Sequence, residues 1–307
     1  MTSLAVLPSL GYLAGCSRQE EGAPTAQVLQ RAPESLPVAA LTERISLLGG
    51  APGNIVVLKT GEGLLLVDSG ASLYVNAVEA SLGGEPVHTL VNTHHHADQT
   101  GANAFFGDKG ALIRAHEITR QWLATDYYVP FEDHWVKAIP EAGQPQATFR
   151  NMEEFTVGQE SIQTGYLLEA HTRGDIYVHF RDSNVLAVGD VASPLFDPSH
   201  DWYAGGWLGG RVDAMDDLLA LANDQTLIVP SYGPVMNRAQ LQAERDMMLH
   251  LYERTTELTD KGRSAQDMLD EGVMDEVDRK FRDPYRFLYD VAKGHWAHYT
   301  NFGGNIV

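Results

Sequence analysis

The stretch Thr93-His94-His95-His96-Ala97-Asp98-Gln99-Thr100-Gly101 is the most informative part of this sequence. It follows a short apolar run, residues 87–92, that predicts a β-strand. In an extended segment, residues two apart point to the same side, so His94 and His96 can present two imidazoles to one metal ion. Asp98 follows near the start of the next helix, where it can bind a metal, orient a water molecule or accept a proton. The stretch therefore predicts a metal centre at the end of a strand.

Strand and helix signals alternate along the rest of the chain. Residues 54–60 and 64–68 are apolar runs on either side of Gly61-Glu62-Gly63, and they predict a β-hairpin. Further strands are expected at 87–92, 111–115, 161–168, 176–180, 185–188 and 227–229, and helices at 72–82, 117–123, 212–221 and 239–258. Strands interleaved with helices, hairpins included, predict a mixed α/β layered fold.

Four short motifs resemble, in the same order along the chain, the landmarks of the metallo-β-lactamase-fold hydrolases. They are Val67-Asp68-Ser69-Gly70, the stretch with His94, His96 and Asp98, His171-Thr172-Arg173-Gly174-Asp175, and Gly189-Asp190. The second motif matches the family's His-x-His-x-Asp-His, and the resemblance covers most of residues 40–250. It implies an α/β (α+β) fold, a four-layer αββα metallo-β-lactamase sandwich with the metal site at one edge between the sheets.

The resemblance also implies a role for each matched side chain. The expected ligands of the first metal ion are His94, His96 and His171. The side chains that correspond to ligands of a second ion are Asp98 and Asp190. The side chains expected to support these ligands are Asp68, Gln99 and Thr172.

Two positions depart from the family pattern, and both belong to the second metal site. Gln99 stands where the family motif ends in His. Tyr232 replaces the His of a Pro-Gly-His-Gly-Pro turn, which reads Pro230-Ser231-Tyr232-Gly233-Pro234 here. A neutral amide and a phenol with an ordinary pKa near ~10 are poor ligands for zinc. The second site therefore keeps two carboxylates and loses both imidazoles, whereas the first site is complete.

Three imidazoles with an open fourth position are typical of a catalytic zinc site. A bound zinc ion lowers the pKa of its water towards ~7, which provides hydroxide at neutral pH. Asp98 is expected to orient that hydroxide and carry its proton to the leaving group, and Tyr232 to donate its O–H to the developing oxyanion. We therefore predict a hydrolase with one zinc ion that acts on the carbonyl of a small ester, lactone, thioester or amide, β-lactams included.

Two other interpretations use the same residues. His94, His171 and Asp190 form a two-His-one-carboxylate set that suits Fe(II), as in the persulfide dioxygenases that share this fold. Those enzymes keep the motif His that is Gln99 here, so zinc is preferred. A chain that has lost half of its site could also be a non-catalytic relative that binds a ligand. The complete set of three histidines argues against such a loss, because packing alone does not require them together.

Composition restricts the partners of this chain. It has 307 residues, with 41 acidic against 22 basic side chains and a formal net charge of −19. Nucleic-acid binding depends on clustered Lys and Arg, so we expect a small-molecule substrate and no nucleic acid. The loops 122–135 and 196–207 are rich in aromatic residues, which suits packing under long loops. Because the second loop closely follows Asp190, it is equally suited to form a wall of the site that favours an apolar portion of the substrate.

The single cysteine of the chain, Cys16, follows the apolar run 4–15 and closes the sequence Leu13-Ala14-Gly15-Cys16. This ending resembles the lipobox of bacterial lipoproteins, and the run is too short to span a bilayer. We expect export, lipidation of Cys16 and a place on the periplasmic face of a bacterial membrane, held by the lipid anchor only. Because no Lys or Arg precedes Cys16, we expect the true start upstream, with a twin-arginine pair. An in-frame Arg-Arg in the genomic DNA would support this expectation, and its absence would count against it.

The remaining parts of the chain have simpler interpretations. Residues 17–38 lack periodicity and are rich in Pro, Glu, Gln and Ala, which predicts a flexible tether. The folded domain is expected over 39–307. Its helical extension, about 239–307, either covers the sandwich or forms the surface of a homo-oligomer. Four other histidines are expected to have structural or solvated roles, namely His95, His116, His134 and His200.

Overall fold

The computed structural model describes residues 32–129 and 133–300 of the chain. The predicted export segment with Cys16, and the part of the predicted tether before residue 32, lie outside these residues. Within the described ranges, no helix is both long enough and apolar enough to cross a bilayer.

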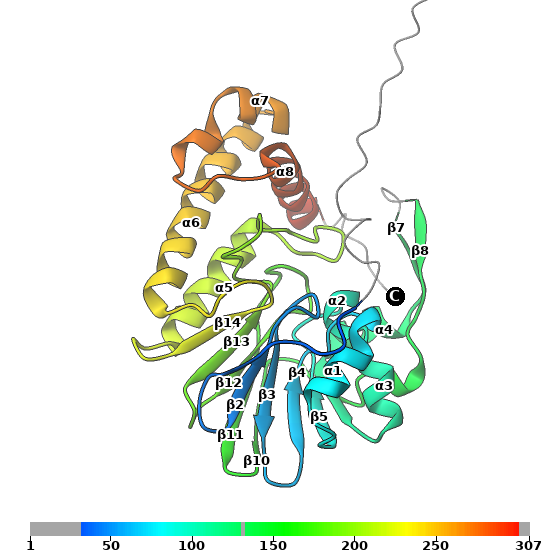
Figure 1. The fold of residues 1–307 in the computed structure, drawn as a ribbon. Helices are drawn as coiled ribbons and strands as arrows, with labels where there is room; N and C mark the ends of the chain where they lie inside the picture. Colours follow the sequence, from blue (N-terminus) through cyan, green and yellow to red (C-terminus); the bar gives the residue numbers. More distant parts are fainter. Residues whose placement is uncertain (1–31, 130–132, 301–307) are drawn as a thin grey trace, which may run out of the picture. The chain divides into compact units, whose positions relative to one another are not determined.

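A seven-stranded sheet contains most strands of the first half of the chain (Figure 1). Its strands, in spatial order, are β1 (Val38–Ala40), β2 (Ile45–Leu48), β3 (Ile55–Lys59), β4 (Leu64–Val67), β5 (Val87–Val91), β6 (Leu112–His116) and β9 (Ala147–Phe149). Strands β1 to β4 pair antiparallel, whereas β4, β5, β6 and β9 run parallel. Because parallel strands end at the same edge, Asp68 after β4 and His94 after β5 leave the sheet side by side.

A five-stranded sheet contains the strands that follow. They are β10 (Met152–Val157), β11 (Glu160–Tyr166), β12 (Ile176–Phe180), β13 (Val185–Gly189) and β14 (Leu227–Pro230), in that spatial order. Only the pair β13 and β14 is parallel, so Asp190 and the turn with Tyr232 also follow neighbouring strand ends. A separate hairpin is formed by β7 (Tyr127–Val129) and β8 (His134–Val136).

Side chains alternate between the two faces of each central strand. In β4, Leu65 and Val67 pack against the other sheet, whereas Leu64 and Leu66 point to the outer side. Strands β3 and β13 alternate in the same way. This period of two gives each sheet two buried faces, one towards the other sheet and one towards helices.

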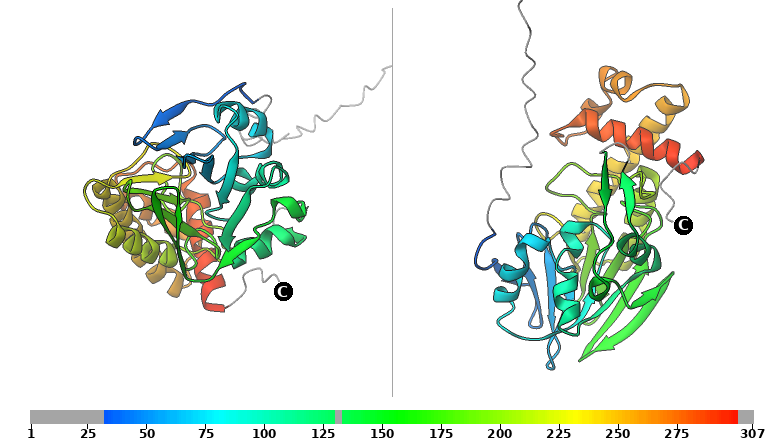
Figure 2. Two further views of the ribbon diagram at one scale, coloured as in Figure 1. Left: turned by 90° about the horizontal axis from the view of Figure 1, so that it is seen from below. Right: turned by 90° about the vertical axis from the view of Figure 1, so that its right-hand side faces the viewer.

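Helices cover both outer faces, so the order of layers is αββα. On the seven-stranded sheet these are α1 (Val75–Ser81) and α3 (Asn103–Asp108). On the five-stranded sheet they are α5 (Leu208–Leu221) and α6 (Arg238–Asp260). Beyond the strand ends, α8 (Pro284–Thr300) packs against these two helices, and α7 (Ala265–Asp270) packs against α8 (Figure 1). The remaining helices are α2 (Ala97–Thr100), α4 (Glu117–Ala124) and the 3₁₀ turns η2 (Ser72–Tyr74), η3 (Glu141–Gly143) and η4 (Val273–Glu276). In Figures 1 and 2, α5 and α6 lie on one side of the sheets and α1 and α3 on the other.

Every strand and helix predicted from the sequence is present, with ends that differ by a few residues. Of the C-terminal extension, α6 lies beside α5 on the outer side of the five-stranded sheet (Figure 1), and a role in a homo-oligomer stays a prediction. Six strands were not predicted, namely β1, β2 and β7 to β10. Four of these have only three residues each, too few to display a period of two. Strand β10 forms an edge of its sheet, and it has no fully buried residue to mark it.

A buried carboxylate connects the two sheets. Glu160, at the start of β11, is fully buried and accepts hydrogen bonds from the backbone N–H groups of Asp182 and Ser183 at 3.0 and 2.9 Å. The Ser183 hydroxyl donates to it at 2.7 Å, and so does the guanidinium of Arg44 at 2.7 Å. Arg44 directly precedes β2, so this ion pair joins one sheet to the other.

We expect Glu160→Gln to lower the free energy of unfolding by about 1–3 kcal/mol, because an amide NH₂ would face donors that now share a carboxylate. Urea unfolding followed by circular dichroism measures this change. Glu154→Gln is the control, since Glu154 is half exposed, and it should shift stability by no more than about 0.5 kcal/mol. An equal loss in both variants would show that Glu160 has no special role.

Candidate metal centre

The candidate site lies where strand ends of the two sheets meet. Asp68 follows β4, residues 93–98 follow β5, Asp190 follows β13, and Tyr232 follows β14. His171 comes from the loop between β11 and β12. Segments that are far apart in sequence are therefore brought together by the parallel pairs β4–β5 and β13–β14, one in each sheet.

Four of the predicted metal ligands gather in one group. His94, His96, His171 and Asp190 each place a donor atom so that all four atoms lie within 4.8 Å of one another. Nδ1 of His96 is 3.2 Å from Nε2 of His171. Two nitrogens bound to one tetrahedral zinc ion, each at about 2.0–2.1 Å, are about 3.3 Å apart. The spacing of these two imidazoles therefore suits a shared metal ion.

The orientation of His94 is set by a chain of hydrogen bonds behind it. The Thr93 hydroxyl donates to Asp68 Oδ2 at 2.8 Å, so its oxygen is left to accept from Nδ1 of His94 at 3.1 Å. The Thr93 backbone N–H binds the other Asp68 oxygen at 2.8 Å. Burial raises the pKa of Asp68 to about 8 despite these two bonds. Asp68 thus supports a predicted ligand, as expected, but through Thr93 rather than by direct contact.

The outer nitrogen of His96 binds a carboxylate that sequence analysis did not identify. His96 Nε2 lies 2.9 Å from Oδ2 of Asp201, and the Ala204 backbone N–H donates to the other oxygen at 2.9 Å. Burial alone would lower the pKa of His96, but the hydrogen bond and charge of Asp201 outweigh it and raise that pKa to about 9. No sequence pattern links these residues, which lie 105 positions apart.

His171 is oriented by backbone groups. Its Nδ1 lies 3.0 Å from the carbonyl oxygen of Ser199, which can only accept, so Nδ1 carries the proton. The Asp175 carboxylate holds the turn, because it accepts from the backbone N–H groups of His171 and Thr172 at 2.6 Å each. The Thr172 hydroxyl donates to the same carboxylate at 2.9 Å. Thr172 therefore supports the loop rather than an imidazole.

The three imidazoles share one consequence of these contacts. Each uses its outer nitrogen as a donor and turns its inner nitrogen towards the cluster, where the raised pKa of His96 keeps a proton on Nδ1 in the absence of a metal ion. Nε2 of His94 is buried without a hydrogen-bond partner among the described residues, and so is Oδ1 of Asp190. Buried acceptors without a partner each cost about 1–3 kcal/mol, and facing lone pairs repel unless a proton or a cation lies between them. The donor set therefore fits a metal ion bound by His94 Nε2, His96 Nδ1 and His171 Nε2.

Asp98 forms a second group with the two residues that depart from the family pattern. The Tyr232 hydroxyl donates to Asp98 Oδ2, and Gln99 Nε2 donates to the same oxygen at 3.3 Å. Oδ1 of Asp98 accepts no hydrogen bond from the part of the chain that the structure describes. Burial, together with the charge of Asp98, raises the pKa of Tyr232 above its usual range, so the phenol stays a neutral donor. Asp98 is not in the group of four donor atoms described above.

The turn with Tyr232 is fixed by Asn54, which directly precedes β3. The side-chain amide of Asn54 donates to the carbonyl oxygens of Pro230 and Gly233 at 2.8 and 3.0 Å. Its backbone N–H donates to the carbonyl oxygen of Ser231 at 2.7 Å. A residue of one sheet therefore holds the turn that follows the last strand of the other sheet. This cross-sheet contact places the phenol of Tyr232 against Asp98.

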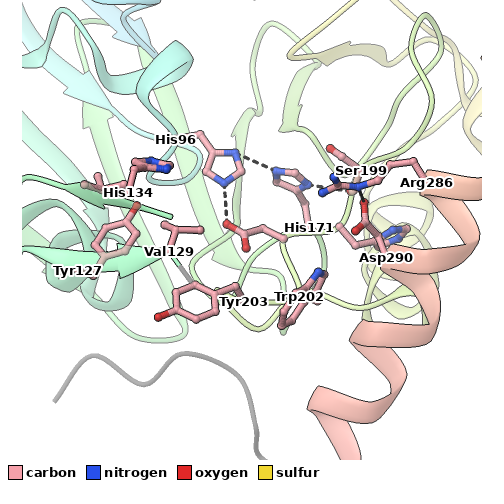
Figure 3. Close-up of a pocket in the computed structure, with 13 residues that line it drawn as sticks. His96, Tyr127, Val129, His134, His171, Ser199, Trp202, Tyr203, Arg286 and Asp290 are labelled. Atoms are coloured by element: carbon pink, nitrogen blue, oxygen red, sulfur yellow. Dashed lines mark hydrogen bonds and ion pairs between the residues drawn. The ribbon is translucent and has the colours of Figure 1, made fainter. Parts of the chain in front are cut away.

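A cavity of about 280 Å³ adjoins the imidazole cluster (Figure 3). His96, His171 and Asp201 line one part of it. Aromatic side chains line another part, namely Tyr127, Trp202 and Tyr203, and Arg286 and Asp290 of α8 contribute charged groups. Both aromatic-rich loops singled out in the sequence therefore contribute to the walls of the cavity.

The other histidines have varied positions. His116 caps α4 through Nδ1, while its Nε2 lies 2.8 Å from the carbonyl oxygen of Arg150, which confirms the predicted structural role. His95 is buried and stacks on Trp122. His134 and His200 both line the cavity. His134 is the first residue of β8, where the sequence had indicated a loop.

Comparison with known proteins gives a family match and several distant relatives. The model of the family described as the Metallo-beta-lactamase superfamily matches residues 48–231, which is more than half of the chain. The 2,4-dinitroanisole O-demethylase subunit alpha of Nocardioides sp. (strain JS1661) is 26% identical over 238 residues, which are 74% of this chain and 63% of the relative. This chain thus spans less than two thirds of that subunit.

Two further proteins are similar. The Metallo-beta-lactamase type 2 of Bacillus cereus is 22% identical over 202 residues, covering 64% of this chain and 73% of the relative. Among solved structures, the metallo-beta-lactamase from Pontibacter korlensis has a TM-score of 0.56 and 18% identity, covering 70% of this chain and 99% of that chain. At this identity, the structural likeness concerns the fold alone.

We expect Thr93→Val to lower the free energy of unfolding of the metal-free protein by about 1–3 kcal/mol, because Asp68 loses a donor and His94 Nδ1 loses its acceptor. Valine keeps the shape of the side chain, so a cavity does not contribute. Thr89→Val in β5, the strand that precedes Thr93, is the matched control, since the Thr89 hydroxyl makes no hydrogen bond with the described residues. Chemical unfolding after metal removal measures both changes. An equal loss of stability in the two variants would contradict a special role for the hydrogen bonds that link Asp68, Thr93 and His94.

Proposed function

This chain belongs to the metallo-beta-lactamase superfamily, and we propose that it is a hydrolase that works with one zinc ion on a small-molecule carbonyl substrate. The observation that carries the proposal is the convergence of three imidazole nitrogens, each fixed by a hydrogen bond on the opposite ring nitrogen. Three neutral imidazoles with an open fourth position are the pattern of catalytic rather than structural zinc.

The preference for a single metal ion rests on Gln99 and Tyr232. Both side chains donate a hydrogen bond to Asp98, and neither offers an imidazole lone pair. Without imidazoles at these two positions, a second zinc ion would have only the carboxylates of Asp98 and Asp190 from this set as ligands. These contacts support a site in which hydrogen bonds replace the second metal ion.

A bound zinc ion would supply a Lewis acid and would lower the pKa of a coordinated water molecule. The chain's own residues would handle the protons. Asp98, held through Oδ2, can accept a proton on Oδ1 and pass it to the leaving group. Tyr232 orients Asp98 in the resting site. Its predicted role as an oxyanion donor requires the hydroxyl to turn away from Asp98, which becomes favourable once that carboxylate has taken a proton.

The cavity favours a small substrate with a flat apolar portion. Its volume of about 280 Å³ is close to the lower limit for small-molecule sites, and aromatic rings form much of its wall. One relative is named for 2,4-dinitroanisole, an aromatic molecule, and another for β-lactams, which are cyclic amides. Both names are compatible with such a pocket. We therefore propose aryl or cyclic esters, lactones, thioesters and amides as the substrates to screen first.

The two alternative functions differ in metal content. An Fe(II) oxygenase would use His94, His171 and Asp190, whose donor atoms also lie in the group of four. A non-catalytic relative would bind no metal or would bind it without turnover. Lipidation at Cys16 stays a prediction from the sequence, and it affects where the protein is held rather than its chemistry.

We expect the purified protein, loaded with zinc and then desalted, to retain about one zinc ion per chain, and His171→Ala to retain none. Restoring the two family histidines in Gln99→His/Tyr232→His should raise the content to about two, because Asp98 and Asp190 are already present. Elemental analysis measures both values. Iron as the metal of the protein isolated from cells would favour the oxygenase, and two zinc ions in the unchanged protein would contradict the single-ion proposal.

For a substrate found by the screen, we expect Asp98→Asn to lower kcat by about 10²–10⁴-fold, because the proton acceptor is lost. Tyr232→Phe should lower kcat by at least about tenfold through loss of the hydrogen bond that orients Asp98. Steady-state kinetics at matched zinc content measures both. If Tyr232→Phe turns over normally while His96→Ala is inactive, Tyr232 has no part in the reaction.

A further inference from the structure

A buried arginine contacts the backbone next to the candidate metal centre. Arg211, in the first turn of α5, is fully buried. It forms no ion pair within 4 Å among the described residues, although a buried charge is costly unless its donors are satisfied. Its guanidinium binds backbone oxygens instead. Because several carbonyl groups of one backbone segment bind this guanidinium, the guanidinium restricts the conformation of that segment.

The segment that Arg211 holds runs from Asp190 to His200 and contains no helix or strand. Nη2 donates to the carbonyl oxygen of Asp190, and also to the hydroxyl of Ser193 at 3.2 Å. Nε donates to the carbonyl oxygen of Val191 at 2.9 Å. Nη1 donates to the carbonyl oxygen of Ser199 at 2.8 Å and lies 3.5 Å from Nε2 of His200. One planar group therefore links the two ends of an irregular loop.

Two of these carbonyl groups belong to the candidate metal centre. The Asp190 carboxylate is in the group of four donor atoms, with Oδ2 at 3.6 Å from Nε2 of His171. The Ser199 carbonyl oxygen is the acceptor for Nδ1 of His171. Arg211 and His171 thus share one acceptor, and the same guanidinium binds the backbone of Asp190. The position of Asp190 and the orientation of His171 both depend on a single side chain outside the cluster.

We propose that Arg211 is a positioning residue of the metal centre. By binding the carbonyl oxygens of Ser199 and Asp190, it sets the tautomer of His171 and the position of the Asp190 carboxylate. This inference rests on the metal site proposed above. A lysine at this position would keep the charge, but its donors all lie on one nitrogen. It could not repeat contacts that the guanidinium makes from three separate nitrogens.

The test compares Arg211→Lys with the unchanged full chain. Competition with a chromophoric chelator should show zinc affinity that is weaker by about 10–100-fold, the usual effect of losing a group that orients a ligand. Arg245→Lys is the matched control, because Arg245 of α6 makes a two-pronged ion pair with Asp216 of α5, the helix that carries Arg211. This control should bind zinc like the unchanged chain.

A second measurement separates this inference from the proposed function. Nitrogen-15 NMR of the imidazoles in the metal-free protein should show His171 protonated on Nδ1 in the unchanged chain and in Arg245→Lys, and a mixture of tautomers in Arg211→Lys. If the unchanged chain binds no zinc, the proposed function fails and the tautomer of His171 alone decides the role of Arg211. Normal zinc affinity in Arg211→Lys, or an unaltered His171 tautomer, would overturn the inference, even if that variant were less stable.

Discussion

The hydrogen bond on the outer nitrogen of each clustered histidine is the interaction on which the site depends. An imidazole can offer a lone pair inwards only if its proton is held outwards. Here the three outward acceptors are a threonine hydroxyl, a carboxylate and a backbone carbonyl oxygen. Three unrelated groups thus produce one result, namely rings whose inner nitrogens converge on one point. Without these acceptors, the same rings could turn their inner nitrogens away from one another.

The fold supplies these acceptors because polar groups can be buried only where the backbone positions them well. One parallel strand pair in each sheet, β4–β5 and β13–β14, brings four chain segments together where these strands end. Small residues then allow close approach. A Cβ on Gly206 would lie 1.9 Å from the carbonyl oxygen of His171, so only glycine fits there. The loop that carries Ser199 and Asp201 can therefore pack directly against the histidine that it orients.

The pair of departures from the family pattern has a consistent physical meaning. Gln99 and Tyr232 do not leave a gap, because both donate to Asp98. The amide and the phenol surround the carboxylate that a second metal ion would otherwise hold. Fixing a carboxylate with neutral donors keeps it available as a base, whereas a metal ion would take its electron pairs. The complete histidine cluster beside this arrangement supports a working site rather than a decayed one.

The sequence by itself determined the layers of the fold and the identity of the clustered donors. A short apolar run such as Leu64–Val67 indicates a strand that is buried on both faces, and the motifs around His94, His171 and Asp190 are local patterns. Tertiary structure alone decided which groups orient those donors. Asp201 is remote from His96 in sequence, Ser199 acts through its backbone, and Arg211 looks like any helical arginine until its burial is known. Such contacts leave no local pattern, because they depend on how two distant segments pack, and packing is a property of the folded chain.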